Sequence, residues 1–297
     1  MSGLPYPDWR DTLETLHMMT QVVGKIQLAL APPVNHWWHV AQHVSARGLR
    51  TEPLPHGDRT FDIELDLVDH VCRLMVSDGD VAHVPLESVA VAEFHDRLVA
   101  ALDERGLHVD FWRQPVEVAD PIAFDEDRVH RSYDATHVTR FFHVLSGADR
   151  ILRRFRGEFL GKSSPVHFFW GSFDLAVSRF SGREAPPHPG GIPNLADHVT
   201  RTAYSHEVFS AGWWPGSEAY PMPAFYAYAY PEPAGFAEAR VPSGGLYSRE
   251  LSEFVLPWPQ ESDTDPVGEE VIAFLRSAYE AAAEFGDWDR LQLEPQR

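Results

Sequence analysis

The sequence repeats itself weakly at a constant offset of 132 residues, and this constrains the fold more than any other feature. The pairs that share this offset are Leu13 with Leu145, Pro33 with Pro165, Trp38 with Trp170 and Arg47 with Arg179. Each half also alternates helix-period and strand-period segments in the same order. The sequence therefore predicts an α+β fold, with two diverged helix–antiparallel sheet–helix repeats packed about a pseudo-twofold seam. Chance matching of periodic apolar segments is the alternative.

Apolar periodicity places the helices and strands of each half. It predicts helices over residues 8–30, 88–106, 134–160 and 266–285, and strands in "FDIELDL", "HFFWGSFDLAVSR", "YSHEVFSAGWW" and "AFYAYAY". The stretch after the first helix, "VNHWWHVAQHVSARG", is expected to be extended, and the acidic row of "FDIELDL" to be a solvated sheet face. The segment "CRLMVSDGDVAHVPL" is expected to form a hairpin that turns at Asp78 and Gly79. The first repeat is expected over 1–120 and the second over 121–297, with a Pro/Gly-rich loop at 181–198. The two repeats should form one compact unit because each can cover the apolar face of the other.

Charge and cysteine content exclude several classes of protein. Acidic side chains number 44 against 25 basic ones, giving a formal net charge of -19, which disfavours nucleic acid and anionic membrane surfaces as partners. The single cysteine, Cys72, cannot form an internal disulfide. The N-terminus lacks a signal-peptide pattern, and no apolar run is long enough to span a bilayer, so a cytoplasmic protein is expected.

The segment "FLGKSSPVHFFWGSFDLAV" contains Gly-Lys-Ser-Ser, the closing letters of a phosphate-binding loop. Such a loop needs a glycine at position 156, where this chain has Arg156, and it must lie between a strand and a helix. Here the predicted order is reversed. The sequence therefore disfavours a nucleotide triphosphatase, and the absence of a Gly-x-Gly-x-x-Gly motif disfavours a Rossmann cofactor. No particular cofactor is indicated.

The same segment supplies the main candidate site residues. His167 and His206 are candidate acid/base groups, and Lys162 is a candidate catalytic cation with the hydroxyls of Ser163 and Ser164 beside it. A candidate anion clamp is formed by Arg179, Arg183 and His188. In one unbent strand, His167 and Arg179 share a face but lie roughly 40 Å apart. The pocket is therefore expected to use one end or the other.

Aromatic walls and a stripe on the first helix complete the candidate set. Trp170, Tyr226 and Tyr228 are expected to line the pocket, while His17, Gln21 and Lys25 recur at i, i+4 and i+8 on one helix face. That stripe is either a ligand-facing surface or the solvated side of the helix. No metal site is predicted, because no ligand spacing fits one; His167 and His206 with Glu207 or Asp174 are the alternative.

Several long segments resemble the bacterial family known as domain of unknown function 5996. They are "HMMTQVVGKIQLALAPPVNHWW", "FDEDRVHRSYD", "FLGKSSPVHFFWGSFDLAVSRFSGREAPPHPGG", "AYSHEVFSAGWWPG" and "FYAYAYPEP", and the resemblance covers nearly the whole chain. It implies a single full-length unit. It implies no activity, cofactor or partner.

The sequence as a whole favours an enzyme that acts on a small anionic, partly aromatic or apolar molecule. The alternatives are a small-molecule binding or sensing protein that uses the same pocket, and a metal-dependent enzyme. The reaction, the substrate and the oligomeric state are not indicated.

Overall fold

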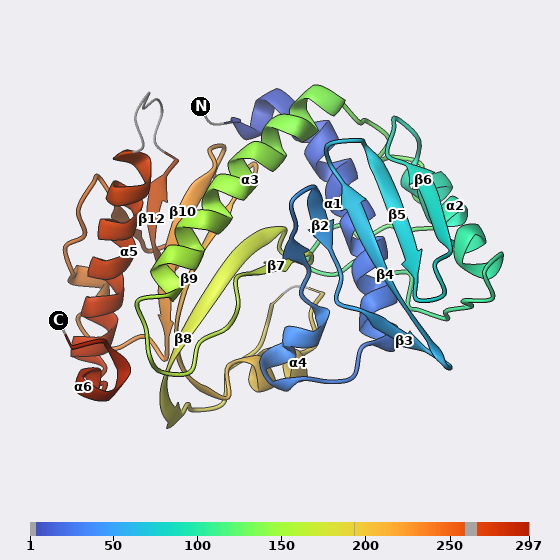
Figure 1. Cartoon of the computed structure of the whole chain (residues 1–297). Coiled ribbons are helices and arrows are strands. Elements are labelled where there is room, and N and C mark those ends of the chain that lie inside the picture. The colour runs from blue at the N-terminus through green and yellow to red at the C-terminus, as the bar shows by residue number, and fades with distance from the viewer. Residues whose placement is uncertain (1–3, 193, 259–265, 297) are drawn as a thin grey trace.

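The computed structural model describes residues 4–192, 194–258 and 266–296 (Figure 1). The first half contains α1 (Tyr6–Leu30), the 3-10 helix η1 (Asn35–Val40), β1 (His43–Val44), β2 (Gly48–Arg50), β3 (Leu54–His56), β4 (Arg59–Asp66), β5 (Val71–Val76), β6 (Val81–Pro85) and α2 (Val91–Asp103). The second half contains α3 (Ala135–Arg156), β7 (His167–Phe169), β8 (Asp174–Glu184), α4 (Asp197–Ala203), β9 (His206–Trp214), β10 (Ala224–Tyr230), η2 (Phe236–Glu238), β11 (Leu246–Ser248), β12 (Glu253–Pro257), α5 (Pro266–Phe285) and α6 (Arg290–Leu293).

Two antiparallel sheets lie side by side, and α3 and α5 pack on one face of the second (Figure 1). The first sheet has the order β1-β2-β4-β5-β6, with β3 on β4, and the second has the order β11-β12-β10-β9-β8-β7. Their edge strands β1 and β7 meet at one bridge, where the backbones of Gln42 and Phe168 exchange hydrogen bonds of 2.9 and 2.8 Å. One hydrophobic core contains buried residues of both halves. The α+β class predicted from the sequence is confirmed.

The internal duplication is not confirmed. Both halves run helix, antiparallel strands, helix, but residues paired at the 132-residue offset occupy different local structures. Trp38 lies in η1, whereas Trp170 follows β7 in a turn. Arg47 precedes β2 and forms an ion pair with Asp66, whereas Arg179 is buried within β8.

The predicted strand from His167 to Arg179 is instead a hairpin, because the chain turns at residues 170–173 between β7 and β8. His167 pairs with Ala176 and Phe169 with Asp174, so odd positions of β7 share a sheet face with even positions of β8. His167 and Arg179 therefore lie on opposite faces of the sheet. The expectation that they share a face is wrong because it assumed one unbroken strand.

Two other local expectations need correction. The stretch after α1 is not extended: it forms η1, and His36 and Trp37 have left-handed backbones with φ of 57° and 61°. The acidic row of "FDIELDL" is not an open, solvated face either. Asp66 is fully buried and forms ion pairs with Arg47 and Arg73. Neutralisation by these arginines explains how a charge can be buried there.

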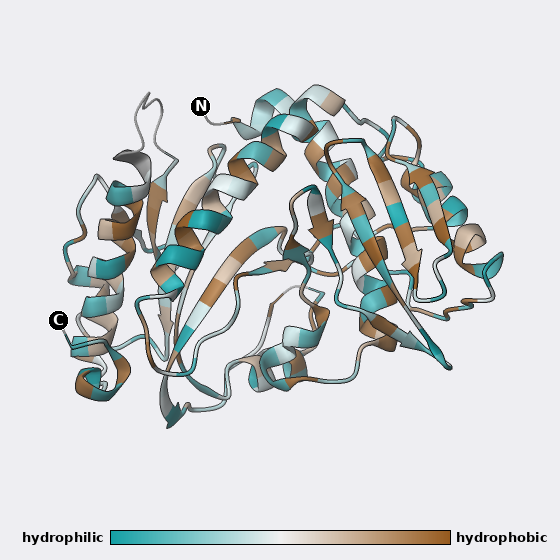
Figure 2. Ribbon diagram, viewed as in Figure 1, coloured by the Kyte–Doolittle hydropathy of each residue, from teal (hydrophilic) through white to brown (hydrophobic). Residues whose placement is uncertain are grey.

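The helices follow their sequence patterns closely. Asp134 caps α3 by accepting hydrogen bonds from the amides of Thr136 and His137, as the sequence of a helix start requires. Hydrophilic side chains dominate the outer surface of α3 (Figure 2). Among the described residues, no helix is both long enough and apolar enough to cross a bilayer.

Candidate functional site

A cavity of about 450 Å³ lies on the face of the second sheet that α3 and α5 leave uncovered. The side chains of alternating positions point into it: Asp174, Ala176, Ser178 and Phe180 from β8, Val208 and Ser210 from β9, and Tyr226 and Tyr228 from β10. Strand register places Ser178, Ser210 and Tyr228 in one cross-strand row. The sheet therefore forms a floor of small polar and aromatic groups.

The remaining walls come from elements of both halves. η1 contributes His36, Trp37 and Trp38, and the connection between α2 and α3 contributes Trp112 and Glu117. Residues 192 and 194–204, which include α4, cover another side, within the Pro/Gly-rich loop predicted from the sequence and just beyond it. The amide of Asn194 donates a hydrogen bond to the carbonyl of Val118, which ties this loop to the opposite wall.

The predicted stripe on α1 forms the back of the site and is not a solvated face. His17 Nε2 lies 2.9 and 3.0 Å from the carbonyls of Trp170 and Gly171 and donates to them, because a carbonyl only accepts. The Gln21 amide exchanges two 2.9 Å hydrogen bonds with the backbone of Val116. These two side chains fix the segments that carry Trp170 and Glu117, and Lys25 follows one helical turn later.

Lys25 presents its ammonium group to the cavity. The residue is only 2% exposed, and its Nζ lies 4.3 Å from the ring centre of Trp112 and 5.8 Å from that of Trp170. No hydrogen bond or ion pair joins it to any other residue that the structure describes. Burial lowers the pKa of Lys25 to about 8, so a fraction of its amine is neutral at physiological pH.

Two carboxyl groups line the cavity, and both have raised pKa values. Glu117 is an exposed residue that lines the cavity, and desolvation by the surrounding protein together with the charge of Asp174 raises its pKa to about 7. Desolvation also raises the pKa of Asp174, whose carboxylate accepts hydrogen bonds from Ser172 and Tyr226. At the start of β12, the strand next to β10, Glu253 has a pKa raised to about 8 by burial and by the charge of Asp174.

Three glycines make room for the groups of the site. A side chain on Gly24 would overlap the indole of Trp170, one on Gly171 would overlap the carboxyl of Glu117, and one on Gly212 would overlap the phenol of Tyr226. The last contact shows how the site is assembled. Tyr226 crosses β9 over Gly212 and reaches Asp174 on β8.

Strained backbone also concentrates here. His36, Trp37, Glu117 and Asn194 line the cavity with φ between 56° and 61°, and Phe173 next to Asp174 has φ of 58°. A left-handed backbone conformation costs free energy in a residue with a side chain of this size. It persists where the surrounding structure enforces it. Such clustering is typical of a functional site.

The predicted arginine clamp does not form at this cavity. Arg179 lies on the opposite sheet face, where its guanidinium packs 3.5 Å from the ring centre of Phe155 and donates to the Phe155 carbonyl. Arg183 forms an ion pair with Glu207 and donates to the carbonyls of Gly286 and Asp287 beyond α5. Both arginines are used to hold the fold together.

The predicted histidines lie behind the walls. His167 is buried, its Nδ1 has no hydrogen-bond partner in the described part of the chain, and desolvation lowers its pKa to about 3. His206 packs edge-on against His36 at 5.7 Å between ring centres. His188 stacks on Tyr204 at 4.9 Å. All three support cavity residues without lining the cavity.

Lys162 lies outside the cavity and contacts His36, which lines it. Its ammonium group donates across 3.1 Å to His36 Nε2, and His36 Nδ1 donates across 2.8 Å to the carbonyl of Ala203. His36 is therefore a neutral Nδ1–H tautomer that joins η1 to α4. Ser163 and Ser164 pair with β8: Ser164 Oγ accepts from the Ser178 amide at 2.8 Å, and Ser163 forms a bridge with Arg179.

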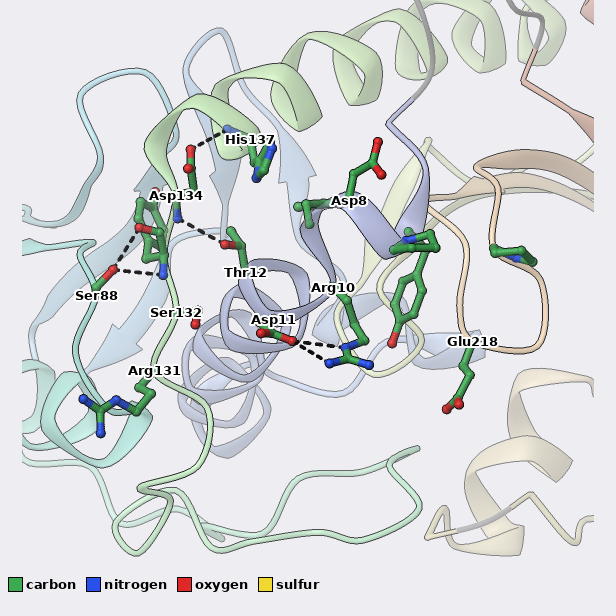
Figure 3. A pocket seen from close by; sticks show the side chains of 15 residues that line it. Asp8, Arg10, Asp11, Thr12, Ser88, Arg131, Ser132, Asp134, His137 and Glu218 are labelled. Atoms are coloured by element: carbon green, nitrogen blue, oxygen red, sulfur yellow. Dashed lines mark hydrogen bonds and ion pairs between the residues drawn. The ribbon is translucent and has the colours of Figure 1, made fainter.

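A second, more open groove of about 890 Å³ lies where the N-terminal ends of α1 and α3 meet (Figure 3). Several of its polar side chains already have partners: Asp134 caps α3, Ser88 bonds to Tyr133, and Arg10 pairs with Asp11. Arg131, which also lines the groove, is exposed to solvent, unlike the buried Lys25. The aromatic cavity is therefore the stronger candidate site.

The whole sequence also matches a known family. The family model described as "Family of unknown function (DUF5996)" covers residues 1–295. The chain belongs to this family. No curated protein and no solved structure matches the chain.

The description of the DUF5996 family names no activity, so the assignment of the candidate site depends on its geometry alone. Across residues 4–192, 194–258 and 266–296, no group of three histidine, cysteine, aspartate or glutamate side chains is arranged to hold a metal ion. The sequence predictions included four residues that line the cavity: Lys25, Trp170, Tyr226 and Tyr228.

Sequence reasoning missed Glu117, Tyr204, His36 and Trp112, and it considered Asp174 only as a metal ligand. Glu117 and Trp112 lie in a long connection without periodicity, where no pattern marks one residue above another. One usable signal was present. Gly24, Gly171 and Gly212 interrupt predicted helix or strand segments, and glycine at such positions often marks a close approach of another group.

Proposed function

We propose that the aromatic cavity is the active site of an enzyme that acts on a small molecule with an aromatic or apolar body and an anionic group. The observation that carries this proposal is the meeting of one unpartnered lysine and two carboxyl groups of raised pKa on a single aromatic cavity. Strongly perturbed titratable groups in one cavity favour catalysis over a purely structural role.

The anion-binding and acid/base roles that the sequence suggested for Arg179 and His167 are here assigned to other residues. Lys25 replaces Arg179 as the cation that faces the ligand, because Arg179 lies across the sheet. Glu117 replaces His167 as the acid/base, because a carboxyl with a pKa of about 7 exchanges protons readily near neutral pH. Trp112, Trp170 and Tyr228 would enclose the apolar body.

Binding of aromatic and aliphatic carboxylates tests the assignment of the site. With phenylacetate and isovalerate as probes and tryptophan fluorescence as the readout, Lys25→Met should weaken binding at least tenfold. Arg183→Ala, which removes a cation outside the cavity, should leave binding within twofold. If Arg183→Ala weakens binding and Lys25→Met does not, the ligand site lies elsewhere.

Native mass spectrometry of protein purified without added ligand separates an enzyme from a binding protein. A retained molecule that is converted on incubation supports catalysis. A retained molecule that is released unchanged, including after Glu117→Gln, favours the binding or sensing alternative.

A further inference from the structure

The chain contains very few lysines, and one of them lines the candidate site. The sequence contains two lysines, Lys25 and Lys162, against twenty-three arginines. Arginine supplies every ion pair between a guanidinium or ammonium group and a carboxylate in the described part of the chain. A lysine differs from an arginine in that it can lose its proton near neutral pH and become a nucleophile.

The surroundings of Lys25 do not hold it as a structural cation, so it can face a ligand as an ammonium group and, once it loses its proton, act as an uncharged amine. No carboxylate or carbonyl of the described chain holds its ammonium group, and two indoles flank it. Trp170 is itself fixed, because its Nε1 donates across 2.7 Å to the carbonyl of Val40 and its ring lies against Gly24. Trp170 thus forms a fixed wall beside Lys25, which lines the cavity without a polar partner in the described part of the chain.

We propose that Lys25 is a nucleophile that forms an imine with a ketone or aldehyde group of the substrate. This proposal rests on the proposed function of the cavity and narrows its substrate class to carbonyl compounds. The aromatic walls and the carboxyl groups of Glu117 and Asp174 lie on the same cavity, so they supply the apolar contact and the proton transfers that imine formation needs.

The step balances with groups of the cavity alone. The Nζ lone pair attacks the carbonyl carbon, a C–N bond forms as the C=O π bond breaks, and one proton moves from nitrogen to the carbonyl oxygen to give a neutral carbinolamine. A carboxylic acid then protonates that hydroxyl, which leaves as water, and the resulting carboxylate takes the remaining proton from nitrogen. The products are a C=N bond and one water molecule, with no oxidant or reductant. Glu117 suits this exchange because both of its protonation states are populated near pH 7.

Reductive methylation tests the nucleophile without knowledge of the substrate. Formaldehyde forms an imine with a free amine, and sodium cyanoborohydride reduces that imine to a stable methylamine. At pH 7, peptide mass spectrometry should show Lys25 methylated several-fold faster than the exposed Lys162 of the same molecules. If Lys25 is methylated no faster than Lys162, or is not methylated, the proposal is overturned.

A larger carbonyl probe tests the substrate class. Phenylpyruvate with cyanoborohydride should give one reduced adduct per chain at Lys25, with the mass of the probe less one oxygen atom. That adduct should disappear in Lys25→Arg and persist in Lys162→Arg. Equal labelling of both lysines would contradict a selective site.

The failure of this inference is distinguishable from the failure of the proposed function. Phenylacetate carries the ring and the carboxylate but no ketone. If phenylacetate binds at the cavity while neither probe reacts at Lys25, the cavity remains the ligand site and the imine is excluded. If Lys25 reacts but phenylacetate does not bind, the anion preference is wrong and the nucleophile stands.

Discussion

Glu117 shows at the level of one residue how the site shapes the stability of the protein. Its ordinary pKa is 4.5, and desolvation with the charge of Asp174 raises it to about 7. The folded protein thus keeps a proton on Glu117 between these pH values while the unfolded chain loses it. Stability from this group is present below pH 4.5 and is lost as pH rises to about 7.

Glu117→Gln should therefore reduce the loss of stability between pH 5 and pH 7.5, because glutamine does not titrate. The free energy of unfolding, measured in urea at both pH values, should fall more in the wild type than in this variant. Glu284→Gln changes an exposed glutamate on α5 and should behave as the wild type does. Identical pH dependence in all three proteins would show that the Glu117 carboxyl is not desolvated.

Lys25 and Glu117 together predict how ligand affinity depends on pH. A carboxylate ligand favours the protonated forms of both groups, whose pKa values are about 8 and about 7. Affinity for phenylacetate should fall at least tenfold between pH 6.5 and pH 8.5. The other titratable groups that line the cavity are Asp174, His36, His198, Tyr204, Tyr226 and Tyr228. A flat profile would exclude Lys25 as the anion-binding cation.

At the scale of single elements, two glycines within helices offer a matched comparison. A side chain on Gly24 in α1 would overlap the indole of Trp170, whereas one on Gly147 in α3 would make only ordinary contacts with Trp258 and Arg150. Gly24→Ala should destabilise the protein by about 1–3 kcal/mol through overpacking. Gly147→Ala should stabilise it by up to about 1 kcal/mol through helix propensity.

Urea unfolding measures both changes, and phenylacetate binding shows their effect on the site. Gly24→Ala should also weaken binding, because Trp170 must move, while Gly147→Ala should not. If the two alanine variants have equal stability, the close contact between α1 and Trp170 is not present in solution.

The elements differ in how far the sequence predicted them. α1, α2, α3 and α5 were predicted to within a few residues at most ends, because 3.6-residue periodicity and a cap such as Asp134 are local signals. The turn at Asp78–Gly79 between β5 and β6 was also predicted correctly, with Gly79 at φ of 93°. The β7–β8 hairpin was missed because its turn, "WGSF", lies between residues that continue a strand pattern on both sides.

The site could be predicted only where a regular element carries it. Strand alternation predicted that Tyr226 and Tyr228 share a face, and helical spacing placed Lys25 in line with His17 and Gln21. Glu117 and Trp112 reach the cavity because Gln21 holds the backbone of Val116, a contact across 95 positions of sequence. Long-range contacts of this kind leave no periodic signal in the sequence.

At the scale of the whole molecule, the two halves depend on each other. The connection between α2 and α3 crosses to the second sheet, where Glu117 packs against Gly171, and buried residues of both halves form one core. Residues 1–120 and 121–297 should therefore unfold in a single cooperative transition. Calorimetry of the full chain should show one peak whose van't Hoff and calorimetric enthalpies agree.

The separate fragment 1–120 provides the sharper test. Without the second half, α1 loses the contacts of Met19 and Val23 with the shared core, and His17 loses the carbonyls of Trp170 and Gly171 that accept its hydrogen bonds. Apolar side chains that the full chain buries are then exposed to water, so this fragment should lack cooperative unfolding and sharp amide dispersion in NMR spectra. A well-dispersed spectrum from 1–120 alone would show instead that the first half is an independent domain, with the cavity at an interface between two domains.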